Sequence, residues 1–115
     1  MTLFEKVYNK LEPLNIPIVR GFYKGNAKSY CIVSVYAETD FNVFDNENEA
    51  ELYKFKITHW HEPNEEDQAK TIKKLMKEAG FRFIYSADLY DDGYFGKALD
   101  FQGVLTLEEL AKGEN

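Results

Sequence analysis

Hydrophobic residues recur along this chain with two periods, and each period predicts a different kind of element. In the first dozen positions they follow helical spacing. Thr2 and Glu5 form the capping-box signature of a helix start, and Pro13 stops the helix near Leu11 or Glu12. The apolar stripe of this predicted helix consists of Leu3, Phe4, Val7, Tyr8 and Leu11.

Two stretches after this helix have the composition of strands. Residues 16–23 should form the first strand, with Pro17 near its start, where a missing amide matters least. Residues 24–27 should form a turn. Residues 29–37 are apolar at both alternating sets of positions, which is typical of a central strand or of one covered on both faces.

The segment 38–50 is predicted to be a mobile acidic loop. Loops of this length are uncommon in compact domains and are often functional. The segment lacks the glycine and the final glutamate that a calcium-binding loop needs. Its apolar residues are more informative, because apolar side chains exposed on such a loop favour contact with another chain. We therefore predict that Phe41, Val43 and Phe44 are contact residues.

A strand and a second helix follow this loop. Residues 51–61 alternate apolar and polar positions, as expected for a strand with one face in water. Asn64 is placed to cap a helix, and Gly80 is the residue expected just beyond its end.

A β-hairpin is predicted after the second helix. Residues 81–89 form its first strand, the Asp-Asp-Gly sequence at 91–93 favours a tight turn, and residues 94–101 form the return strand. Tyr90 and Tyr94 flank the turn, and we predict that they are further contact residues. The alternating apolar positions of the first strand are Phe83, Tyr85 and Ala87.

Together these elements predict one α+β domain over residues 1–115. A C-terminal tail at 106–115 should hold one or two polar helical turns. The element order is α-β-β-β-α-β-β. Because most connections are short hairpins, the sheet should be small and mainly antiparallel. The two longer helices should pack together on one of its faces.

Composition narrows the class of partner. The formal net charge is −6, so the chain has no electrostatic footprint for nucleic acid or for an anionic membrane. Aromatic residues are numerous, with nine Phe and eight Tyr, and such residues are favoured at association surfaces. The one cysteine, Cys31, cannot form an internal disulfide. We expect a buried, reduced thiol in a cytosolic protein without a signal peptide.

Candidate chemistry is sparse. His59 and His61 are two residues apart in a strand, so they share a face and could meet one metal ion, with Glu51 or Glu62 as an oxygen donor. Structural metal sites usually need about four protein ligands, so the favoured interpretation is a polar strand end without metal. A nucleophilic pair of Cys31 with either histidine lacks an activating setting. We predict no catalytic residue and no cofactor.

Several stretches of the chain carry a resemblance to a known family. They are residues 14–18 followed by Gly-Phe-Tyr at 21–23, the strand at 53–60, the helix end at 73–83 and the hairpin at 85–101. In these residues the chain resembles the small tail-completion proteins of long-tailed bacteriophages and prophages. That group includes tail terminators and the neck proteins that join head to tail.

The resemblance implies a structural virion protein that is not an enzyme. Such proteins assemble in the bacterial host cytoplasm as rings, typically hexamers. Their partners are further copies of the same chain, the tail tube and neck proteins, with no specific nucleic-acid or membrane binding. Two other classes stay open: a small metal- or ligand-binding protein that uses His59 and His61, and a bacterial adaptor that binds a peptide at a sheet edge.

Overall fold

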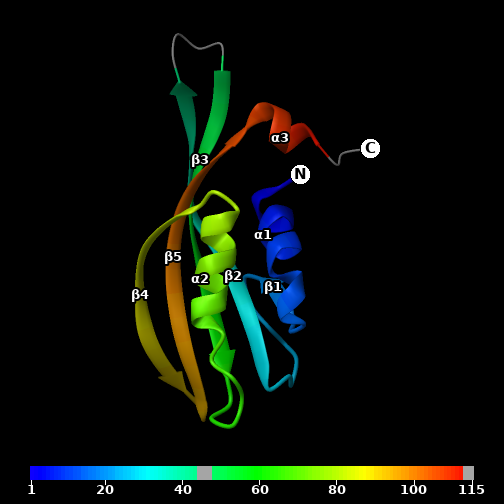
Figure 1. Ribbon diagram of the computed structural model, residues 1–115, viewed down its shortest axis with the longest axis vertical. Coiled ribbons are helices and arrows are strands. Elements are labelled where there is room, and N and C mark those ends of the chain that lie inside the picture. The colour runs from blue at the N-terminus through cyan, green and yellow to red at the C-terminus, as the bar shows by residue number, and fades with distance from the viewer. Residues whose placement is uncertain (44–47, 113–115) are drawn as a thin grey trace.

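Five strands form one twisted sheet, and two helices lie side by side across one of its faces (Figure 1). The computed structural model describes residues 1–43 and 48–112, and of residues 42, 43, 48 and 49 it describes the backbone alone. The strand order is β1-β2-β3-β5-β4, which confirms the predicted α+β class. The elements are α1 (Leu3–Leu11), a 3-10 helix η1 (Glu12–Leu14), β1 (Ile18–Arg20), β2 (Ser29–Val43), β3 (Asn48–His61), α2 (Ala69–Glu78), β4 (Arg82–Asp91), β5 (Tyr94–Thr106) and α3 (Leu107–Ala111).

The two ends of the described chain meet beside α1. The predicted capping box is confirmed: the Thr2 hydroxyl accepts from the Glu5 amide at 3.1 Å, and the Glu5 carboxylate accepts from the Thr2 amide at 3.1 Å. The predicted C-terminal helical turn is α3, capped in the same way by Thr106. Lys6 of α1 pairs with Glu109 of α3 at 3.1 Å, so the tail is joined to the first helix.

The first strand departs from the prediction. β1 is three residues long and runs parallel to β2, with Ile18 opposite Cys31. A tight hairpin at 24–27 would have made the pair antiparallel. Instead the chain turns away at Gly21, whose φ is +82°, and comes back through an irregular segment. The Tyr23 hydroxyl stabilises that segment by accepting from the Ala27 amide at 3.0 Å.

Most of the predicted acidic loop is strand. β2 runs to Val43 and β3 begins at Asn48, and the two pair in antiparallel register throughout. The prediction of a loop at 38–50 was wrong because acidic residues hid a period-two alternation through Thr39, Phe41 and Val43, which are strand-forming types. The pair extends beyond the helices as a long arm (Figure 1). We call residues 38–43 and 48–50 the hairpin arm.

The second helix begins later than predicted. Asn64 does not cap it; α2 starts at Ala69, whose amide donates to the Asp67 carboxylate at 2.9 Å. The stretch from Glu62 to Gln68 is therefore an irregular connection at the end of β3. The predicted stop is confirmed, because Gly80 has a φ of +94° just after the helix.

The core lies between the sheet and the helices α1 and α2. Phe55 of β3 is at its centre, with its ring 5.0 Å from that of Phe81 and 5.6 Å from that of Phe101. Cys31 is fully buried in the same core, as predicted, and burial raises the pKa of its thiol to about 12. In the described part of the chain, no helix has the length and apolar character that crossing a membrane requires.

Candidate functional site

Within the described residues, no helix covers the sheet face opposite α1 and α2 (Figure 1), and this face carries a cluster of polar side chains. Residues paired across strands share a face, so Lys56, Asp100 and Tyr85 lie in a row on β3, β5 and β4. Asp100 is only 4% exposed, and its carboxylate is 3.9 Å from the Lys56 ammonium group. Burial and the negative charge of Asp100 raise the pKa of Tyr36.

Large apolar side chains lie beside this cluster and are exposed on both faces of β4. β4 is an edge strand, because β5 is its one pairing partner among the described residues. Its exposed backbone groups and apolar side chains together form the kind of edge to which another chain can add. The exposed large apolar residues of the sheet include Tyr36, Phe41, Ile84, Tyr85, Leu89, Tyr90, Phe95 and Val104.

The predicted contact residues fall into two groups at opposite ends of the sheet. Phe41 is 38% exposed on the hairpin arm; Val43 is the last residue of β2, and Phe44 lies outside the described residues. At the other end, Tyr90 is 67% exposed. Tyr94 is half-buried and donates to the Ala27 carbonyl at 3.1 Å, so it fixes the segment before β2.

Sequence patterns did not identify Tyr85 as an exposed residue. The alternation predicted that Phe83, Tyr85 and Ala87 share one face. A β-bulge between Phe83 and Tyr85 shifts the register, so Phe83 faces the core while Tyr85 is 54% exposed on the opposite face. The apolar stretch had no glycine to signal the bulge.

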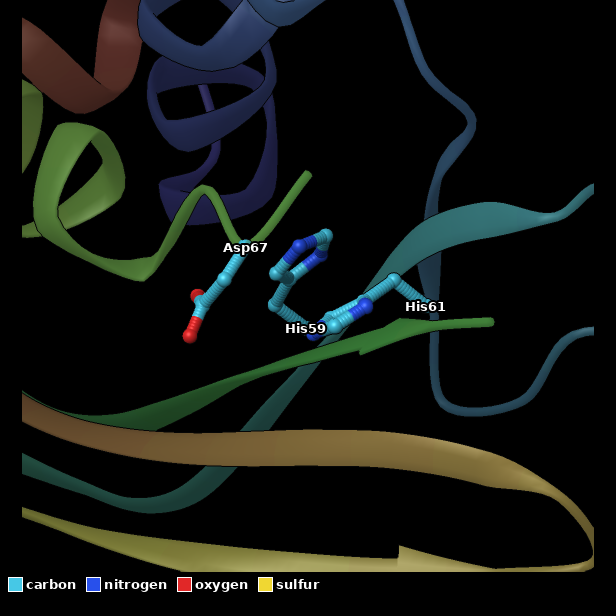
Figure 2. A group of neighbouring side chains, drawn as sticks. All are labelled: His59, His61 and Asp67. Atoms are coloured by element: carbon cyan, nitrogen blue, oxygen red, sulfur yellow. The ribbon is translucent and has the colours of Figure 1, made fainter. Parts of the chain in front are cut away.

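The two histidines of β3 lie near Asp67, a third residue of a type that binds metal ions. His59 and His61 stack at the end of the strand with ring centroids 5.3 Å apart, and Asp67 comes from the connection to α2 (Figure 2). One nitrogen of each ring and one carboxylate oxygen lie within 4.8 Å of one another. The predicted oxygen donors do not join this group: Glu51 lies at the far end of β3, where Tyr53 donates to it.

Backbone carbonyls orient both rings. His61 Nδ1 is 2.8 Å from the Glu62 carbonyl oxygen, and His59 Nδ1 is 3.3 Å from that of Tyr30. Burial lowers the pKa of His59, and the backbone carbonyls of Tyr30 and Glu66 oppose that shift. His59 is fully buried, and its Nδ1 atom also lies 3.8 Å from the Cys31 sulfur.

A cavity of about 510 Å³ lies beside His61, on the helix face of the sheet near the start of α2. His61 and Asp67 contribute to its wall, and an ion pair between Lys97 and Asp88, 2.6 Å apart, closes one side. Tyr90 and Phe95 form the apolar side, with their ring centroids 5.4 Å apart. The remaining lining residues are Leu89 and Gly96.

Comparison with known proteins gives a similarity of fold. No protein-family model matches the sequence, and no curated protein matches it. Among solved structures, the chain is similar to a chain of the "Virion of native gene transfer agent (GTA) particle", with a TM-score of 0.58 and 15% identity. The similarity covers 90% of this chain and 94% of the other, so the two share the fold over nearly their whole lengths.

Proposed function

We propose that this protein is a structural subunit of a phage-like virion, and that it acts by assembly into a ring at the end of the tail or at the junction of tail and head. The observation that carries the proposal is the similarity of fold, along almost the full length of both chains, to a component of a gene transfer agent virion.

A ring subunit needs two different surfaces that contact each other head to tail. The sheet has two different edges on opposite sides, because β1 and β4 are the outermost strands. β1 pairs only with residues 31–33 of β2, so the outer edge of the hairpin arm has no strand partner among the described residues. The β4 edge carries Ile84 and Tyr90, which are 43% and 67% exposed.

Both edges have the residue types of protein interfaces. Exposed tyrosine and phenylalanine side chains supply contact area at low conformational cost. On this proposal the hairpin arm of one subunit, with Phe41, packs along β4 of the next. The net charge of −6 suits a ring through which DNA passes, because an acidic surface does not hold phosphates.

The oligomeric state tests ring assembly. We expect light scattering to give a mass several times 13.4 kDa as the concentration rises, or upon addition of tail tubes, and negative-stain images to show closed rings. Mass action favours the ring at high subunit concentration. A protein that stays monomeric at high concentration and also with tail tubes would contradict the proposal.

A further inference from the structure

We propose that His59, His61 and Asp67 form a binding site for one zinc ion at the end of β3. This inference is independent of the proposed virion role, because it rests on side chains at the cavity and not on the sheet edges. Two imidazole nitrogens and a carboxylate oxygen are ligands that Zn²⁺ accepts in tetrahedral sites. Mg²⁺ and Ca²⁺ prefer oxygen ligands throughout, so the pair of histidines argues against them.

The hydrogen bonds of the rings leave the other ring nitrogens for the metal. Each Nδ1 lies near a backbone carbonyl, at 2.8 Å for His61 and 3.3 Å for His59. A proton on Nδ1 leaves the lone pair on Nε2. Zinc-binding histidines in proteins are oriented in this way, with the second nitrogen donating to a carbonyl or carboxylate.

The burial of His59 Nε2 is a second, separate indication of a bound metal ion. This atom is buried and has no hydrogen-bond partner among the described residues. A buried polar atom without a partner costs free energy, and each such atom in a folded protein calls for an explanation. A zinc ion bound to Nε2 would satisfy it.

The ligand atoms need only a small movement to close around an ion. They lie within 4.8 Å of one another, whereas bonds of about 2.0–2.2 Å to a tetrahedral zinc place ligands roughly 3.3 Å apart. Asp67 is exposed and belongs to the irregular connection before α2. Rotation of its side chain supplies the movement. The Ala69 amide donates to Oδ1, and no group of the described residues donates to Oδ2.

Three protein ligands leave one coordination position for water or a ligand. His61 and Asp67 both contribute to the wall of the 510 Å³ cavity, so a fourth ligand would come from the cavity. Bound zinc would also join the connection before α2 to the end of β3. We therefore expect zinc to raise thermal stability as well as to occupy the site.

Calorimetric titration of untagged, chelator-treated protein with ZnCl₂ tests the site. We expect one zinc ion per chain, a rise in Tm of about 5 °C or more at saturation, and no binding of Mg²⁺. Asp67→Asn keeps an oxygen for the Ala69 amide but removes the charge, and it should weaken zinc binding at least about tenfold. Glu66→Gln, the neighbouring exposed carboxylate, is the matched control and should change affinity less than about twofold.

The double variant His61→Ala/Asp67→Asn should lose the stoichiometric site while its circular dichroism spectrum stays that of the parent. Co²⁺ gives a second readout, because tetrahedral cobalt has visible absorption that this variant should lose. Absence of zinc binding by the parent protein would overturn the proposal. Equal binding by the parent and the double variant would overturn it as well.

Discussion

The double substitution Ile84→Lys/Tyr90→Lys is expected to raise the concentration at which the subunits assemble by about 100-fold. Both side chains are exposed on the β4 edge, and natural edge strands use lysine to prevent the addition of another strand. Loss of a central aromatic or aliphatic contact costs about 1–2 kcal/mol or more, and every 1.4 kcal/mol is tenfold in affinity. Light scattering across a dilution series measures the shift.

Tyr8→Lys is the matched control for this pair. Tyr8 lies on α1 and is 42% exposed, so this variant places one lysine at a similar exposure but away from the sheet edges. Its assembly should match that of the parent, and Tm should be unchanged in both variants. If the β4 variant assembles as the parent does, the proposed contact along β4 is wrong.

Phe55→Ala should lower the free energy of unfolding by about 3–5 kcal/mol, which is a large share of the roughly 5–15 kcal/mol that stabilises a typical domain. Phe55 is 0% exposed, and its ring packs against those of Phe81 and Phe101. The helices and the sheet cannot collapse fully into the space left. Urea unfolding, at a concentration where the protein is monomeric, measures the loss.

Phe22→Ala provides the comparison at a residue of the same type. Phe22 is 66% exposed, so its replacement should change the free energy of unfolding by no more than about 0.5 kcal/mol. Equal losses for the two variants would mean that the core is not centred on Phe55.

Local signals with a direct physical cause were readable from the sequence. Thr2 and Glu5 predicted the start of α1, since two side chains satisfy each other's backbone amides. Asp92 and Gly93 predicted the turn before β5, where both residues have positive φ, at +47° and +84°. In each case the residues that make the structure lie within three positions of each other in the chain.

The features that the sequence did not reveal depend on contacts between distant segments. β1 is parallel to β2 because the chain turns away at Gly21, and composition does not distinguish that turn from a hairpin. The start of α2 was misplaced because Asn64 and Asp67 are both good capping residues. The bulge after Phe83 is fixed by pairing with β5.

The candidate site was readable only in part. Period two predicted that His59 and His61 share a face, and the structure has both on the face packed against the helices. Asp67 was not predicted to join them, because it would have lain inside a helix starting at Asn64. The late start of α2 leaves Asp67 in the connection beside the histidines. Because Asn64 does not cap α2, Asp67 lies outside the helix, where it can act as the third ligand of the proposed zinc site.

The most direct test of the virion role is the composition of particles purified from cells that encode this protein. We expect mass spectrometry to find the protein in the particles at a copy number that corresponds to one ring per particle, far below that of the major capsid protein. Antibody labelling should mark the end of the tail or its junction with the head. Absence of the protein from purified particles, while it accumulates in the same cells, would contradict the account.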